Sequence, residues 1–124
     1  MNKHFRNVPD GHYPINGCAL LVRDAWIRLY NLTDLPKHTD QFVTIQKASK
    51  LMNEYKGLLV EQINQPEHGC MVTTRQGKRW HCGIYSTEQM PHHVIHCVAG
   101  KVKIETFHQF KQRFDSVEFY KCLQ

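Results

Sequence analysis

The dominant spacing of hydrophobic residues changes after Tyr55, and that change limits the possible folds more than any other feature. Up to Tyr55 the apolar residues recur at the three- and four-residue intervals of amphipathic helices. From Cys70 onward they fall in short runs typical of β-strands, separated by turn-forming residues. This order predicts an α+β domain in which N-terminal helices pack on one side of an antiparallel sheet.

The first helical segment is expected to be the main core helix, from Cys18 to about Tyr30. Its core-facing residues recur at helical spacing, and they are Cys18, Leu21, Ala25 and Leu29. A run of polar turn formers and then Pro36 follow it. These residues are expected to end the helix.

A second helix is expected from about Thr39 or Asp40 to Tyr55, because a capping residue precedes another amphipathic run. Gly57 follows as a helix stop. Residues 58–63 fit either a short strand or the tail of that helix. An antiparallel meander, a short helix and a last strand then complete the predicted order, at 70–74, 78–85, 93–98, 101–104, 106–114 and 117–123.

Length and composition indicate a single domain. With 124 residues, 41% of them hydrophobic, the chain can bury one core without disulfides or bound metal. No repeat, low-complexity tract or linker divides it, so we expect one domain over residues 1–124, with 1–12 as an N-terminal extension. No apolar run is long enough for a membrane span, and residues 1–10 contain no signal-peptide core. We therefore expect synthesis in the cytoplasm.

The cysteines do not form the pattern of a disulfide framework. There are five, an odd number, and no two of them make a Cys-x-x-Cys pair that would suggest a zinc knuckle. Most are therefore expected to be small buried hydrophobic residues. Cys18 differs from the others because it opens a predicted helix.

The chain carries a net charge of +5 and has an isoelectric point of about 9.0. This favours an anionic partner, such as a cell-wall polymer, a nucleic acid or a lipid surface. The lysines and arginines are scattered without a dense basic run. We therefore interpret them as a solvated surface and predict no nucleic-acid partner.

Three positions carry the residue types of nucleophilic catalysis, in the order nucleophile, base and orienting group. Cys18 lies at a predicted helix start, where the helix dipole lowers a thiol pKa. Strand alternation puts His81 on one face together with Gly83, which leaves room beside the ring. His96, on a neighbouring predicted strand, is expected to accept the other ring proton and fix the tautomer of His81.

These residues resemble the NlpC family of papain-like cell-wall endopeptidases. Residues 17–22, 81–85 and 95–97 match its Asp-Cys-Ser-Gly-Leu-Val helix start, His-Val-Gly-Ile-Tyr strand and Ile-His-Ala strand. The similarity extends roughly from Tyr13 to the C-terminus. The nearest subtype, found among phage tail proteins, has Cys-Trp-x-Leu-Val-Arg and a downstream Leu-Pro. Residues 18–23, Cys-Ala-Leu-Leu-Val-Arg, and Leu-Pro at 35–36 resemble these motifs.

The resemblance implies a papain-like fold and a cysteine peptidase or amidase. The implied reaction is hydrolysis of an amide in peptidoglycan stem peptides, of the γ-D-glutamyl–diamino acid type, through a thioacyl-enzyme. Cys18 would be the nucleophile, His81 the base and His96 the third polar group. Tyr13 and the Cys18 N–H are the candidate oxyanion and substrate-binding donors. No cofactor is implied, and a phage tail or secretion assembly would carry the protein to the cell wall.

The sequence departs from the family pattern at three places. Gly17 replaces the aspartate before the nucleophile, residues 19–20 replace Ser-Gly, and Cys70 replaces the aspartate of a Gly-Asp pair. These changes keep an alternative open, in which a non-catalytic papain-like domain serves as a structural or wall-binding part of a phage tail or secretion assembly.

A metal site is a second alternative, because residues 92–97 and the pair 81–82 contain histidines and cysteines that suit zinc or copper. On a strand, however, His93 and His96 point to opposite faces. They cannot both bind one ion without a β-bulge, so no metal site is predicted.

Overall fold

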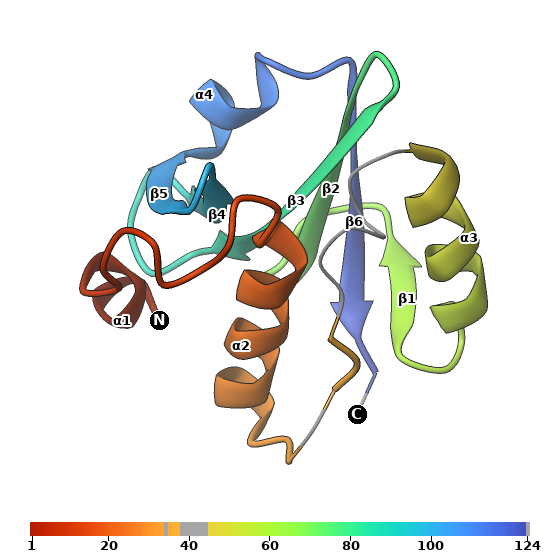
Figure 1. Ribbon diagram of the computed structural model, residues 1–124, viewed down its shortest axis with the longest axis horizontal. Coiled ribbons are helices and arrows are strands. Elements are labelled where there is room, and N and C mark those ends of the chain that lie inside the picture. The colour runs from red at the N-terminus through yellow and green to blue at the C-terminus, as the bar shows by residue number, and fades with distance from the viewer. Residues whose placement is uncertain (34, 38–44, 124) are drawn as a thin grey trace.

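The computed structural model describes residues 1–33, 35–37 and 45–123. Along this part of the chain, helices come first and the strands of one sheet follow, interrupted by a short helix before the last strand (Figure 1). The elements are α1 (Asn2–Arg6), α2 (Cys18–Tyr30), α3 (Ile45–Tyr55), β1 (Val60–Ile63), β2 (Met71–Gln76), β3 (Arg79–Ser86), β4 (His93–Val98), β5 (Lys101–Thr106), α4 (Phe107–Lys111) and β6 (Ser116–Cys122). The predicted α+β class is confirmed.

The six strands form one antiparallel sheet in the order β1-β6-β2-β3-β4-β5. The predicted meander is confirmed for β2 to β5, whose neighbours in sequence are neighbours in space. Strand β6 returns to lie between β1 and β2. The sequence did not indicate this position, because it depends on pairing between strands distant along the chain.

Helix α2 covers one face of the sheet and has the bounds predicted from its periodicity. Its buried residues include Leu21, Ala25 and Trp26, which face the sheet core. The Trp26 indole N–H donates to the Gly69 carbonyl at 2.8 Å, which fixes the helix against the entry to β2. The helix ends at Asn31, whose φ of 52° is the left-handed conformation common after helix C-termini.

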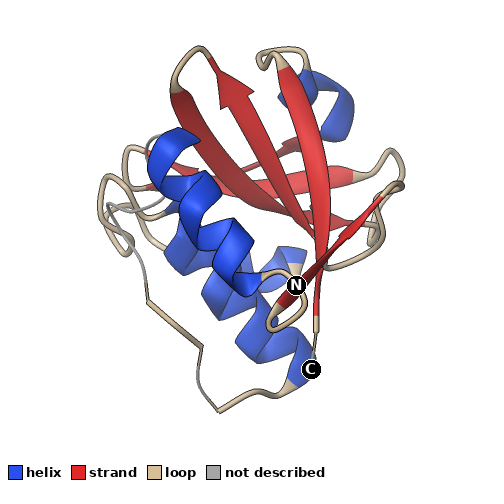
Figure 2. Cartoon of the chain, turned by 90° about the vertical axis from the view of Figure 1, so that its right-hand side faces the viewer, coloured by secondary structure: helices blue, strands red, loops and turns tan. Residues whose placement is uncertain are grey.

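Helix α3 lies on the same side of the sheet as α2 (Figure 2) and adds buried Ala48 and Met52 to the same core. It ends at Tyr55, two residues before Gly57, as predicted. Its predicted start at Thr39 or Asp40 lies outside the described residues. Of the two alternatives for residues 58–63, the strand is the one observed, as β1.

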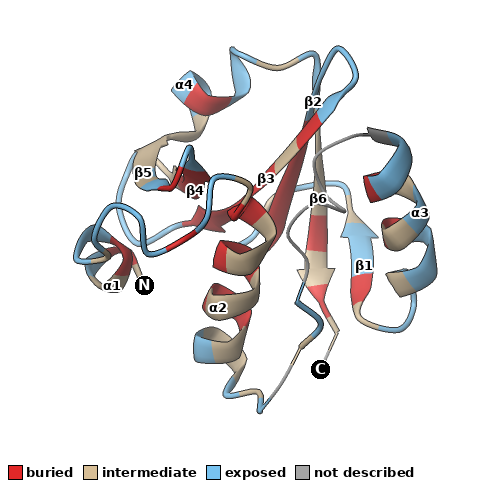
Figure 3. Cartoon of the chain, in the orientation of Figure 1, coloured by how far each residue is buried: buried red, intermediate tan, exposed pale blue. Residues whose placement is uncertain are grey.

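The sheet has a hydrophobic core on each face. Cys82 and Ile84 face α2 and α3, whereas Tyr85 belongs to a second cluster around Phe110 of α4. This confirms the predicted alternation along β3. Figure 3 shows buried positions concentrated on the central strands and on the inner side of α2. Helix α4 is shorter than the predicted segment 106–114, and Thr106 caps it by accepting from the Gln109 N–H at 3.2 Å.

Residues 1–12, predicted as an extension, pack against the rest of the domain. They include α1, whose Phe5 is fully buried in the larger core. The Gly11 N–H donates to the Gly100 carbonyl at 2.9 Å, so this segment also contacts the turn between β4 and β5. A helix of 5 residues is too short for periodicity to predict.

None of the helices in the described ranges is both long and apolar enough to cross a bilayer.

Strands β3 and β4 separate at one end, and this separation makes room for the site described below. Their pairing runs from Ser86 and His93 to Gly83 and His96, and stops there. Beyond this pair β3 continues to Arg79 alongside β2, while β4 continues to Val98 alongside β5. Gly83 is therefore the last residue of β3 that lies directly against β4.

Replacing Gly83 with alanine should destabilise the domain, because the added Cβ would lie 2.8 Å from the Ile95 carbonyl oxygen and 2.8 Å from Val94 Cγ1. The first contact is with backbone, which cannot move without disturbing the strand pair. We expect Gly83→Ala to lower the free energy of unfolding by about 2 kcal/mol, measured by urea denaturation. Lys101→Ala, at an exposed strand position, is the control and should change it by less than about 0.5 kcal/mol. Equal stability of the two variants would contradict this account.

Candidate functional site

Cys18 is the first residue of α2, and the chain enters it through a tight bend. At Gly17 an added Cβ would lie 2.8 Å from both the Pro14 carbonyl oxygen and Tyr13 Cβ. A glycine therefore fits here where an aspartate would not without a change in the bend. The local backbone thus favours glycine at this position over the aspartate of the family pattern. As the first helical residue, Cys18 has an N–H that no carbonyl within the helix can accept.

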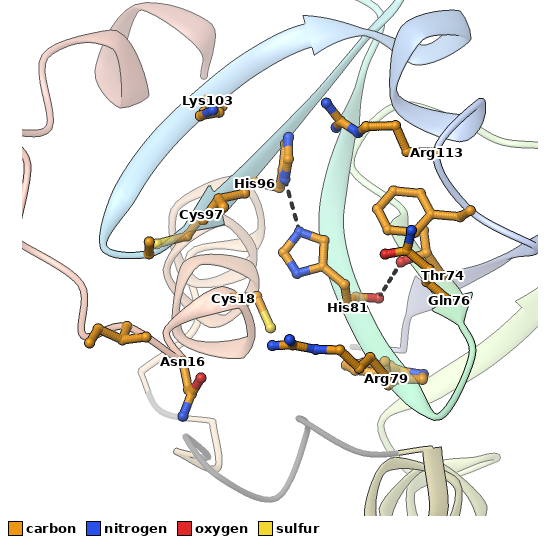
Figure 4. Close-up of a pocket in the computed structure, with 15 residues that line it drawn as sticks. Asn16, Cys18, Thr74, Gln76, Arg79, His81, His96, Cys97, Lys103 and Arg113 are labelled. Carbon is orange, nitrogen blue, oxygen red and sulfur yellow. Dashed lines mark hydrogen bonds between the residues drawn. The ribbon is translucent and has the colours of Figure 1, made fainter.

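Three side chains on neighbouring strands form a hydrogen-bonded chain. His81 Nε2 and His96 Nδ1 are 2.8 Å apart, and His96 Nε2 lies 2.6 Å from Glu105 Oε1. A carboxylate only accepts, so His96 donates from Nε2 and uses Nδ1 to accept the Nε2–H of His81. The bond to His96 uses Nε2 of His81, so the other ring nitrogen, Nδ1, is left to face a different group. Figure 4 shows Nδ1 turned toward the sulfur of Cys18.

Arg113 binds Glu105, the last side chain of this hydrogen-bonded series. Its guanidinium donates to both carboxylate oxygens of Glu105 and forms an ion pair with them. Together with the hydrogen bond from His96, these contacts lower the pKa of Glu105, although partial burial opposes them. The carboxylate is therefore ionised at neutral pH and stays an acceptor for His96.

Of the three hydrogen-bonded side chains, His96 is the most buried, with a side chain only 1% exposed. Burial, with the nearby His81 ring, lowers its pKa to about 4, and the hydrogen bond to Glu105 opposes this only in part. His96 is thus neutral at neutral pH. A neutral His96 with its proton on Nε2 is the form that accepts from His81.

The environment of Cys18 favours the thiolate. Hydrogen bonds from the Cys82 side chain and from the His81 ring hold the pKa of Cys18 well below its usual range, although burial opposes them. Cys82 is fully buried, and burial raises its own pKa well above the usual range. Cys82 therefore remains a protonated donor toward the sulfur of Cys18.

Aromatic rings hold the two histidines in place from the face that carries α4. The ring of Phe114 stacks on His81, with 6.1 Å between centroids and 23° between planes. Phe110 meets His96 edge-on at a centroid distance of 4.9 Å. The imidazoles therefore have apolar walls that limit their rotation without competing for their hydrogen bonds.

A cleft of about 590 Å³ opens where β3 and β4 separate. Cys18, His81 and His96 all lie on its wall, where the loop before α2 meets the two strands (Figure 4). Cys18 is 8% exposed and is one of the residues that line this space. The described residues that line the cleft are Ile15, Asn16, Cys18, Thr74, Gln76, Arg79, Trp80, His81, His96, Cys97, Val98, Ala99, Lys103, Arg113 and Phe114.

Tyr13 is not among the described residues that line this cleft. Its side chain is buried, and its hydroxyl donates to Asp24 Oδ2 at 2.6 Å. Burial and this hydrogen bond raise the Tyr13 pKa. The structure therefore brings Cys18, His81 and His96 together but directs the Tyr13 hydroxyl to α2.

Glu105, Arg113 and Cys82 were not identified as site residues from the sequence. Strand register explains why Glu105 reaches His96. His96 lies opposite Lys103, and Glu105 is the next residue of β5 on the same face, diagonally across from His96. A carboxylate two positions along a neighbouring strand was the available signal. It could not be used before the register of β4 and β5 was known.

The histidine-rich part of β4 was also considered as a metal site. In the described ranges, no group of three or more His, Cys, Asp or Glu side chains is arranged to hold a metal ion. His92 Nδ1 instead lies 2.8 Å from the Tyr85 hydroxyl.

Comparisons of the chain with protein-family profiles, with curated proteins and with solved structures found no match.

The depressed pKa of His96 makes stability depend on pH. An unfolded histidine takes up a proton near pH 6.5, but the folded one does so only near pH 4, so the unfolded state binds more protons between these values. Stability should therefore fall as pH falls from 6.5 to 4.5. We expect His96→Gln to lose less over this interval, by on the order of 2 kcal/mol, in urea denaturation at both pH values. Parallel losses in the two proteins would show that His96 titrates normally.

Proposed function

We propose that this chain is a papain-like cysteine hydrolase that acts through a thioacyl-enzyme on Cys18. One observation carries the proposal: a low-pKa thiol at a helix start faces an imidazole whose other nitrogen is held by a hydrogen-bonded chain. Activated thiols of cysteine hydrolases need this arrangement of nucleophile, base and orienting group. The three groups come from α2, β3 and β4 and meet on one cleft.

The first half of the reaction uses Cys18 and His81 as a pair. The Cys18 thiolate attacks the carbonyl carbon of an amide, and the carbonyl oxygen takes the negative charge. The Cys18 N–H at the start of α2 is placed to stabilise this oxyanion, because helix N-termini favour negative charge. His81 then gives the proton on Nδ1 to the leaving nitrogen, the C–N bond breaks, and a thioester on Cys18 remains.

The second half regenerates the enzyme. His81, now neutral at Nδ1, takes a proton from a water molecule as the water attacks the thioester. The C–S bond breaks, the acid product leaves, and the thiolate–imidazolium pair is restored. Throughout, His96 accepts the Nε2–H of His81, so the imidazole keeps the orientation in which Nδ1 serves Cys18.

The substrate class in this proposal comes from the resemblance to the NlpC family. We propose an amide of peptidoglycan stem peptides, of the γ-D-glutamyl–diamino acid type, with delivery to the cell wall by a phage tail or another carrier. The net charge of +5 suits an anionic wall polymer. The chemistry at Cys18 does not depend on this choice of substrate.

Cys18→Ala and His81→Ala should each lower kcat/KM on purified stem peptides by at least about 10³-fold, because the two groups act as a unit. The double variant should be little worse than either single variant. Product formation is followed by chromatography and mass spectrometry. Cys122→Ala removes a thiol that does not line the cleft and should keep activity.

Full activity of Cys18→Ala would refute the proposed nucleophile. Absence of activity in the unsubstituted protein, on any stem peptide, would favour the non-catalytic structural or wall-binding role.

A further inference from the structure

The side chains that line the cleft beside Cys18 carry an excess of positive charge. Three cationic side chains line it, Arg79, Lys103 and Arg113, and no aspartate or glutamate is among its described lining residues. The low-dielectric walls of the cleft strengthen the positive potential of these side chains, so the cleft attracts anions. The thiolate of Cys18 supplies one negative charge, which already pairs with His81.

The three cations are not equally available. Arg113 is engaged by the Glu105 carboxylate, which in turn holds His96. Arg79 and Lys103 are both exposed, and within the described ranges neither side chain has a hydrogen bond or ion pair. In Figure 4 the guanidinium end of Arg79 extends from β3 toward Cys18 and His81, whereas Lys103 lies on β5, on the far side of His96. Of the two exposed cations, Arg79 is therefore the one that extends toward the reacting sulfur.

The cleft also has an apolar part. It comes from the loop before α2 and the C-terminal end of β4, which present Ile15, 76% exposed, and Val98, 40% exposed. A substrate in the cleft thus meets apolar side chains as well as the guanidinium of Arg79. A neutral amide would leave the guanidinium without a partner.

We propose that Arg79 is a substrate-binding residue that selects acyl donors with a carboxylate close to the scissile carbonyl, and that Lys103 adds to the attraction from across the cleft. The inference rests on the proposed function, because only an acyl-transfer reaction at Cys18 places a scissile carbonyl there. A guanidinium offers a planar, two-pronged donor set that matches a carboxylate. In a peptide-like acyl donor, the anion next to the carbonyl is a carboxylate rather than a phosphate.

Two alkylating reagents of nearly equal shape test this without turnover. Iodoacetate carries a carboxylate and iodoacetamide a neutral amide, and in both cases the thiolate displaces iodide to form an S–C bond. Rates at Cys18 are read by peptide mass spectrometry, and the ratio of the iodoacetate rate to the iodoacetamide rate is divided by that of a free-cysteine peptide. We expect this ratio to exceed one and to fall by about fivefold in Arg79→Gln at low salt, because one nearby positive charge is lost.

Two controls separate a specific contact from general charge. Lys78→Gln removes the same charge from the adjacent exposed residue, which does not line the cleft, and should leave the ratio unchanged. Lys103→Gln should lower the ratio by less than Arg79→Gln does. The ratio in the unsubstituted protein should also decline as salt screens the cleft.

Each remaining outcome has one meaning. A ratio unchanged in Arg79→Gln, with Cys18 still fast toward iodoacetamide, overturns the Arg79 assignment and leaves the proposed hydrolase intact. Equal slowing of both reagents in Arg79→Gln also overturns it, because Arg79 would then stabilise the thiolate instead of binding an anion. Slow reaction of Cys18 with both reagents in the unsubstituted protein removes the proposed function and this inference together.

Discussion

The separation of β3 from β4 beyond the pair formed by Gly83 and His96 is the constraint on which the site depends. In a continuous sheet, His81 would be confined to the face that carries α4 and Cys18 to the face that carries α2. Because the strands part at this point, the His81 ring reaches His96 on one side and the sulfur of Cys18 on the other. Gly83 allows the close approach of the strands from which they then diverge.

The buried chain of His81, His96 and Glu105 turns that opening into a chemical arrangement. An exposed imidazole would rotate and exchange tautomers, whereas here each nitrogen has a defined role from the Glu105 carboxylate inward. The burial that lowers the His96 pKa keeps this residue neutral, and a neutral His96 can accept from His81. Desolvation therefore costs stability in acid but fixes the orientation of the base.

Local signals in the sequence were enough to predict much of this structure. Helical periodicity placed Cys18 at the start of α2, and strand alternation placed His81 and Gly83 on one face, with His96 on a neighbouring strand. These are regularities of adjacent residues, so they need no knowledge of the tertiary fold. The hydrogen bond predicted between the two histidines is also present.

The features that were missed depend on contacts between distant segments. The position of β6, the register that brings Glu105 to His96, and the hydrogen bond from Cys82 to Cys18 all arise from packing between elements. Tyr13 illustrates the converse case, since its proximity to Cys18 in sequence suggested a role in the cleft, yet its hydroxyl bonds to Asp24. The short helix α1 lacked the length for a periodic signal.

The rate of iodoacetamide labelling at each cysteine between pH 5 and 9 reports on the pairing of the Cys18 thiolate with His81. Burial raises the pKa of the other four thiols, so each of them serves as an internal reference. We expect Cys18 alone to react rapidly well below pH 8, and His81→Ala to abolish this reactivity. If Cys18 titrates like an ordinary thiol, or reacts equally fast in His81→Ala, the thiolate is not paired with His81.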